Sequence, residues 1–130
     1  MVDPASDWPA LLIATGATIV CTSQTGERTI PAREFFLDTF TTAIEPTEIL
    51  TQIRLPRRPK HAGGAYEKLE RKVGDFATVG AAVMIRLDQS GSIFGAGIGV
   101  TGVAETPFAA TDAEAVLVGN ASSDALFRQA

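Results

Sequence analysis

A glycine-rich run near the end of the chain has the spacing of a dinucleotide-binding loop. Residues 97–102, GIGVTG, match G-x-G-x-x-G. In such loops the glycines lie between a strand and a helix N-terminus, where backbone N–H groups bind a pyrophosphate. Here the flanking residues predict one continuous strand, and no helix follows. We therefore interpret the alternating Gly95, Gly97 and Gly99 as a strand face without side chains, against which another element packs.

Basic residues gather in the middle of the chain. Seven of the 11 lysines and arginines are Arg54, Arg57, Arg58, Lys60, Lys68, Arg71 and Lys72. One interpretation is a solvated linker and strand whose charges pair with Glu67, Glu70 and Asp75. The other is a local anion site or docking patch on an otherwise acidic protein. Lys68 is the best single candidate for the second interpretation, because a compact ammonium suits a phosphate or an electron-rich ring.

Two further residues could be reactive, and each has a simpler interpretation. Cys21 is the single cysteine, and its apolar surroundings in the sequence predict a buried, unreactive thiol. His61 is the single histidine and falls in a linker, which predicts exposure rather than catalysis. One cysteine and one histidine leave too few ligands for a zinc site. No Ser-His-Asp set, phosphate loop or acid/base pair is evident.

The composition is that of an ordinary globular protein and excludes several function classes. The 130 residues suit one domain or two small half-domains, and 45% hydrophobic with 20% charged residues excludes a disordered chain. A net charge of -4 argues against nucleic-acid binding, because that affinity comes largely from neutralised phosphates. No apolar run approaches the roughly 20 residues of a membrane span, and no signal peptide is recognised. We expect a cytoplasmic protein.

Antiparallel strands with short flanking helices are predicted, which is an α+β class. A helix that Ser6 can cap ends at Gly16. The expected strands are residues 17–22, 28–30, 49–55, 65–71, 79–87 and 93–103, and further helices begin at Thr111 and Ser122. Residues 57–64 contain prolines, basic residues and a glycine pair and are typical of a linker. We place a domain boundary there, which divides the chain into residues 1–60 and 61–130.

Two stretches, taken in order, resemble a known family. The first comprises DPASDWPA at 3–10, Phe35-Phe36, Thr41-Thr42 and PTEIL at 46–50, and the second is AYEKLERKVGDFA at 65–77. Together they resemble the FAD-binding medium subunit of molybdenum hydroxylases, the aerobic carbon monoxide dehydrogenase and xanthine dehydrogenase family. Each piece alone is weakly specific, but the ordered set covers essentially the whole chain.

The resemblance implies a definite architecture. Residues 1–60 would be the C-terminal half of the FAD-binding domain, with an antiparallel sheet. Residues 61–130 would be the domain that ends the medium subunit in this family, its C-terminal domain, with a three-stranded antiparallel sheet and helices, incomplete at its end. Members of the family carry an additional N-terminal half, whose glycine-rich segments grip the FAD pyrophosphate. The chain is therefore expected to be a fragment.

The resemblance also implies three FAD-binding residues. Asp7 matches an aspartate that accepts hydrogen bonds from the hydroxyl-bearing chain of the flavin, which suits carboxylate oxygens. Leu50 matches an apolar residue lying against the isoalloxazine, and Lys68 matches a lysine whose charge would favour reduced flavin. Further contacts are expected from Ser6, Thr41 and Thr42. We expect Asp7, Leu50 and Lys68 to converge on one open concave surface.

The function implied by the resemblance is electron transfer within an oxidoreductase. In that family a large molybdopterin subunit oxidises the substrate, and a small iron–sulfur subunit relays electrons through 2Fe–2S clusters. The medium subunit passes them through FAD to an external acceptor. The isolated fragment is expected to be inactive. The alternative is a non-catalytic interaction or scaffold domain that binds no flavin by itself and docks a partner through the glycine-faced strand and the basic linker.

Overall fold

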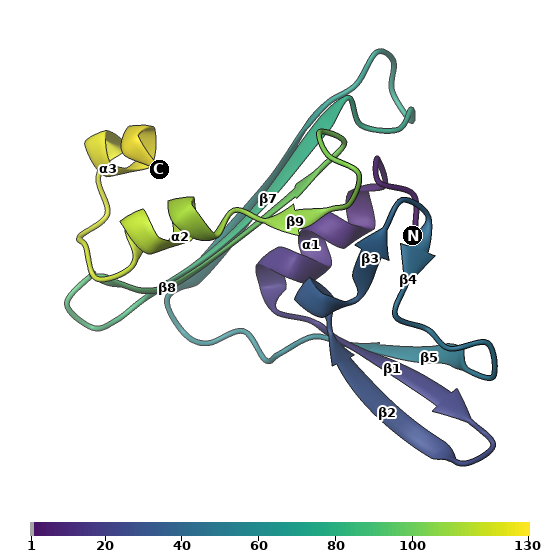
Figure 1. Cartoon of the computed structure of the whole chain (residues 1–130). Helices are drawn as coiled ribbons and strands as arrows, with labels where there is room; N and C mark the ends of the chain where they lie inside the picture. The colour runs from purple at the N-terminus through teal and green to yellow at the C-terminus, as the bar shows by residue number, and fades with distance from the viewer. Residues whose placement is uncertain (1) are drawn as a thin grey trace.

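The computed structural model describes residues 2–130 and contains three antiparallel sheets: two larger ones, of three and four strands with a helix packed between them, and a small two-stranded one (Figure 1). The elements are α1 (Asp7–Thr15), β1 (Thr18–Ser23), β2 (Gly26–Pro31), the 3-10 turn η1 (Ala32–Glu34), β3 (Phe36–Asp38), β4 (Thr41–Thr42), β5 (Ile49–Arg54), β6 (Ala62–Leu69), β7 (Val79–Leu87), β8 (Ile93–Thr101), β9 (Phe108–Ala109), α2 (Thr111–Leu117) and α3 (Asp124–Gln129). The expected α+β class is confirmed. Across residues 2–130, none of the helices is both long and apolar enough to cross a membrane.

The first sheet has the strand order β2-β1-β5. The strands expected at residues 17–22 and 28–30 are present and pair as a hairpin, with Ser23 opposite Gly26 across a two-residue loop. Ile19, Val20 and Cys21 of the central strand are all buried, which shows that both faces of β1 are covered, because successive side chains point to opposite faces. Burial raises the pKa of the Cys21 thiol, and the nearby Glu48 carboxylate raises it further. This agrees with the unreactive cysteine that the sequence predicted.

The second sheet has the order β6-β7-β8-β9, all antiparallel. It contains the three expected strands and adds the two-residue β9 at one edge. Strand β6 begins earlier than the sequence indicated, because Gly63 and Gly64 pair with Ile85 and Met84 of β7. The glycine pair was interpreted as linker, but strand pairing uses backbone groups, which glycine has in full.

The glycine-faced strand lies directly beneath α1, as the sequence analysis predicted. A Cβ atom added at Gly97 would overlap the carbonyl oxygen of Ala14, and one added at Gly99 would overlap that of Ala10. The absence of side chains on this face of β8 therefore lets the helix backbone rest on the strand backbone. Figure 1 shows α1 alongside the ribbon of β7 and β8, with the chain continuing from the helix into β1 of the first sheet.

Helix α1 contributes to two hydrophobic cores. Leu12 and Ile13 belong to the core of the first sheet, which also contains Phe35. Ala10 and Ala14, four residues apart on another side of the helix, pack in a second core. A helix buried on two sides explains why its sequence is apolar almost throughout. Through α1 the two sheets share one structural support.

One end of helix α1 is held as the sequence predicted, and the other is not. Gly16 ends the helix in a left-handed conformation (φ 71°), as predicted. The Ser6 side chain makes no capping hydrogen bond, so that prediction was wrong. Instead, the buried hydroxyl of Thr101 donates to the backbone carbonyls of Pro4 and Ser6, at 2.5 and 2.9 Å. The start of α1 is thus tied to the end of β8 rather than to its own cap.

Candidate functional site

Asp7 stands in the first turn of α1, and two side chains from β6 bind its carboxylate. The Tyr66 hydroxyl donates to Oδ1 at 2.7 Å, and the Lys68 ammonium donates to Oδ2 at 3.1 Å. Tyr66 and Lys68 share one face of β6, because side chains alternate along a strand. The structure therefore brings together two of the three predicted site residues, Asp7 and Lys68, which are 61 residues apart in the sequence.

Lys68 is surrounded by acceptors. Besides Asp7, its Nζ lies 2.7 Å from Glu70 Oε2 and 3.0 Å from the backbone carbonyl of Asp75. Its side chain is 17% exposed. The hydrogen bonds to Glu70 and then Asp7 raise the pKa of the Lys68 ammonium, which keeps it charged. Lys68 is consequently a fixed cation between two carboxylates rather than a free one.

Tyr66 is a member of this cluster to which the sequence analysis gave no role. Its ring packs against the core formed by Ala10, Ala14 and Ala82. Burial, followed by the hydrogen bond to Asp7, raises the pKa of the phenol well above its ordinary value, so the hydroxyl remains a donor. The available sequence signal was its spacing, two residues from Lys68 on the same strand face.

A cavity of about 220 Å³ opens beside the cluster and is lined by Asp7 and Lys68 together with Ser6, Trp8 and Phe76. The two aromatic residues are 62% and 65% exposed. The site thus combines a carboxylate that can accept hydrogen bonds, a fixed cation and exposed aromatic surface. These groups can hold a ligand that carries hydroxyl groups and a flat apolar part. Ser6, expected as a further contact, does line this cavity.

Leu50 does not line this cavity. It lies in β5, opposite Cys21 of β1, and packs half-buried against the core of the first sheet. Thr41 and Thr42 form the short strand β4 and do not line the cavity either. Of the three predicted residues, Asp7 and Lys68 therefore lie together at this cavity and Leu50 does not. The role of Leu50 stays a prediction.

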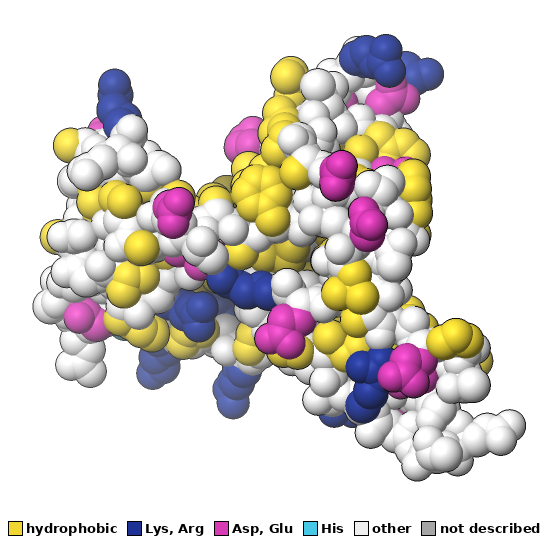
Figure 2. Space-filling model, viewed as in Figure 1, with side chains coloured by type: hydrophobic (Ala, Val, Ile, Leu, Met, Phe, Trp, Pro, Cys, Tyr) yellow, Lys and Arg dark blue, Asp and Glu magenta, His cyan; other side chains and the backbone are white. Residues whose placement is uncertain are grey.

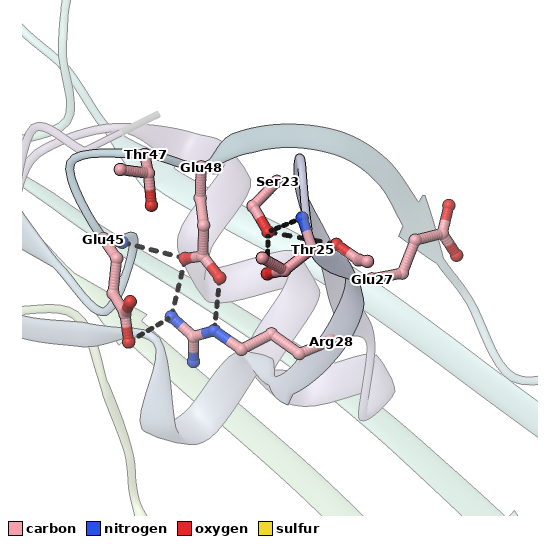
Figure 3. Close-up of a pocket in the computed structure, with 8 residues that line it drawn as sticks. Ser23, Thr25, Glu27, Arg28, Glu45, Thr47 and Glu48 are labelled. Atoms are coloured by element: carbon pink, nitrogen blue, oxygen red, sulfur yellow. Dashed lines mark hydrogen bonds and ion pairs between the residues drawn. The ribbon is translucent and has the colours of Figure 1, made fainter.

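An ion pair fixes the turn that leads into β5. Arg28 Nε and Nη2 bind the two carboxylate oxygens of Glu48 at 2.5 and 2.7 Å (Figure 3), and Nη2 also donates to the Ala43 carbonyl. The bond from Arg28 is the main reason why the pKa of Glu48 is lowered. These groups border a second cavity of about 240 Å³. Because they satisfy one another, we assign them a structural role that the sequence analysis missed.

The basic residues that cluster in the sequence are dispersed in space. Arg54 lies 3.8 Å from Glu27, Lys72 lies 3.8 Å from Asp75, and Arg58 donates to the Ala62 carbonyl. Figure 2 shows the Lys and Arg side chains of one face in separate groups rather than in one patch. The interpretation of solvated, partly paired charges therefore holds for most of the cluster, and Lys68 is the member that belongs to the candidate site.

Two family models match the chain, and they meet at the segment between the two sheets. Residues 1–58 match the FAD binding domain in molybdopterin dehydrogenase, and residues 64–130 match the CO dehydrogenase flavoprotein C-terminal domain. Asp7 comes from the first matched region and Tyr66 and Lys68 from the second, so the cluster joins the two regions. Both family models describe domains of flavoproteins of the molybdopterin dehydrogenase and CO dehydrogenase class.

Similar proteins agree with this class. The chain is 47% identical over 119 residues to the carbon monoxide dehydrogenase medium chain of Afipia carboxidovorans, covering 92% of this chain and 41% of that protein. It is 32% identical over 123 residues to xanthine dehydrogenase of Emericella nidulans, covering 93% of this chain and 9% of that protein. The chain thus spans less than half the length of these relatives.

Solved structures give the same result. Reconstituted CO dehydrogenase from Oligotropha carboxidovorans superposes with a TM-score of 0.88 at 45% identity, over 96% of this chain and 43% of the other. Quinoline 2-oxidoreductase from Pseudomonas putida 86 does so with a TM-score of 0.80 at 28% identity, also over 96% and 43%. The chain belongs to the FAD-binding medium-subunit family of the molybdenum hydroxylases.

Proposed function

We propose that this chain forms part of a medium subunit that holds FAD and passes electrons from iron–sulfur clusters through the flavin to an external acceptor. The clusters would lie in a small subunit, and a large subunit with molybdopterin would oxidise the substrate. The complex would be cytoplasmic. Residues 1–60 would complete the FAD-binding domain, and residues 61–130 would form most of the C-terminal domain.

The observation that carries this proposal is the position of the Asp7 carboxylate. It borders a cavity, its side chain is 39% exposed, and donors from β6 hold both of its oxygens. Each carboxylate oxygen has a further lone pair with which it can accept a hydrogen bond from a ligand hydroxyl. A held, partly exposed acceptor of this kind suits the polyhydroxyl chain of a flavin nucleotide.

The size of the cavity indicates that only part of FAD would enter it. Its volume of about 220 Å³ lies below the range of about 300–1,000 Å³ that is typical of pockets enclosing a whole ligand. The two aromatic side chains that line it are largely exposed, Trp8 at 62% and Phe76 at 65%. These surfaces support a site completed by the additional segments that the longer relatives carry.

Each residue would have a separate task. Bound FAD would supply the electron-accepting and electron-donating chemistry. Asp7 would orient the flavin through its hydroxyl groups. Lys68 would hold Asp7 and contribute one positive charge, which Asp7 and Glu70 offset, so the local potential would be less positive than that of an isolated lysine. Leu50 would contact the ring from β5.

Titration with FAD tests the proposal. Flavin fluorescence would be followed as FAD is added to the chain alone, and to a complete subunit in which the chain is joined to the additional segments that the longer relatives carry. We expect tight binding only in the second case, and weaker binding when Asp7→Ala is introduced. Lack of binding by the complete subunit would favour a scaffold role without flavin.

A second measurement addresses Lys68 by itself. In the complete, FAD-loaded subunit, Lys68→Ala should lower the flavin reduction potential, because it removes a positive charge that favours reduced flavin. Lys72→Ala removes an equal charge from a side chain that is 79% exposed and is the matched control. Equal potentials for Lys68→Ala and the unmodified protein would contradict the proposed effect of the charge.

A further inference from the structure

We propose that Tyr66 is a positioning residue for the flavin: its hydroxyl holds the Asp7 carboxylate in the orientation that faces the cavity. The inference rests on the proposed function. It assigns to Tyr66 a role in FAD affinity that acts through Asp7 and needs no contact with the flavin.

The geometry separates Tyr66 from the other donor to Asp7. Lys68 divides its ammonium among Asp7, Glu70 and the Asp75 carbonyl. The Tyr66 hydroxyl, by contrast, has one hydrogen bond, to Asp7 Oδ1 at 2.7 Å. A phenol also has few rotatable bonds, so it holds a partner at a low cost in conformational entropy. The orientation of Asp7 therefore depends on Tyr66 more than on Lys68.

The surrounding residues are small where the ring of Tyr66 lies. Its ring packs among alanines, one of which, Ala82, lies on β7 directly opposite Tyr66 of β6. A Cβ atom added at Gly80 would overlap the Tyr66 hydroxyl and would lie 2.8 Å from Thr101 Cγ2. Glycine and alanine thus leave a space between α1 and β7 that the ring fills, and this space directs the hydroxyl to Asp7.

The first test measures FAD affinity in the complete subunit. Tyr66→Phe keeps the ring and removes the hydroxyl, and we expect it to weaken FAD binding about tenfold without a large change in melting temperature. Thr15→Val is the matched control, because it removes a hydroxyl at the opposite end of α1, where Thr15 donates to the Leu11 carbonyl at 2.7 Å. This control should leave FAD affinity unchanged.

A double-mutant cycle shows whether Tyr66 acts through Asp7. If it does, adding Tyr66→Phe to Asp7→Ala should cause no further loss of FAD affinity. A purely structural tyrosine would instead weaken binding by the same factor in both backgrounds, which would overturn the inference. If Asp7→Ala weakens binding but Tyr66→Phe does not, the inference fails while the proposed function stands. If the complete subunit binds no FAD, the proposed function fails and the inference with it.

A spectroscopic readout needs no flavin. Tyr66 is the single tyrosine of this chain, so the ultraviolet absorbance of phenolate reports its ionisation alone. We expect ionisation above the ordinary pKa of 10.0, and at a lower pH in Asp7→Ala than in the unmodified chain, because burial and then the bond to Asp7 raise the pKa. Identical titration curves for the two proteins would show that the bond does not form and would overturn the inference, even if Tyr66→Phe failed to fold.

Discussion

Replacing Gly99 by alanine should displace α1 and destabilise the chain. A Cβ atom at this position would overlap the backbone carbonyl oxygen of Ala10, which belongs to the middle of the helix. A long side chain could rotate away from an added methyl group, but a helix backbone cannot. Helix and strand must therefore move apart, and the shared packing of α1 on β8 is weakened.

The size of the effect follows from the packing. Adding a methylene-sized group to a well-packed core costs about 1–3 kcal/mol, and a backbone obstacle favours the upper part of that range. With an unfolding entropy of about 2.1 cal/mol/K per residue over 130 residues, about 2–3 kcal/mol corresponds to a fall in melting temperature of about 7–11 °C. The loss should also weaken the bonds to Asp7, because Asp7 lies on the displaced helix.

Thermal unfolding followed by circular dichroism measures this effect. Gly63→Ala is the matched control, since Gly63 also lies in a strand but a Cβ atom there meets nothing within 4 Å. This control should be neutral or raise stability by about 0.4–1 kcal/mol, because alanine restricts the unfolded chain. If Gly99→Ala proved as stable as Gly63→Ala, the placement of α1 on β8, and with it the site, would be refuted.

Three further predictions concern groups outside the candidate site. Arg28 lowers the pKa of Glu48, so the wild-type chain should be more stable than Glu48→Gln at a pH above the ordinary pKa of 4.5. Urea unfolding should show that this difference in the free energy of unfolding is lost as the pH falls below 4.5. A difference independent of pH would contradict the ion pair. Thr101→Val removes the hydroxyl that bonds the Pro4 and Ser6 carbonyls, although Pro4 still accepts from the Gly102 N–H, and it should cost about 1 kcal/mol in the same assay; an unchanged stability would argue against the bonds of the hydroxyl. Cys21 should react with a thiol reagent only as fast as the chain unfolds, and rapid labelling of the native chain would show that the thiol is accessible.

The sequence analysis succeeded where a structural signal is local. The helix end at Gly16 could be predicted because the left-handed conformation that glycine adopts there needs no distant partner. The strands expected at residues 17–22 and 28–30 are likewise present, as the hairpin of β1 and β2. Gly97 and Gly99 were recognised as a packing face from their alternation alone. The resemblance to a family added Asp7 to Lys68, which the basic cluster had already singled out, and the structure brings the two into contact.

Other features required contacts between distant parts of the chain. The Tyr66 bond to Asp7 spans 59 residues, and the pair of Arg33 and Glu114, at 2.6 and 2.9 Å, spans 81. No local pattern predicts such partners, because residue type states what a side chain can bind but not what packing places beside it. The same reason explains the Ser6 error: a serine before a helix can cap it, but here the backbone is held by Thr101.

The sequence by itself therefore determined the α+β class, the order of the longer strands and the helices, the burial of Cys21 and, through its resemblance to a family, the kind of protein. Only the tertiary structure decided that α1 supports both sheets, that the basic residues disperse, and that Lys68 lies between carboxylates. The physical reason is range. Backbone conformation and hydrophobic periodicity act over a few residues, whereas the charge and orientation of a binding group depend on neighbours that packing brings together from far along the chain.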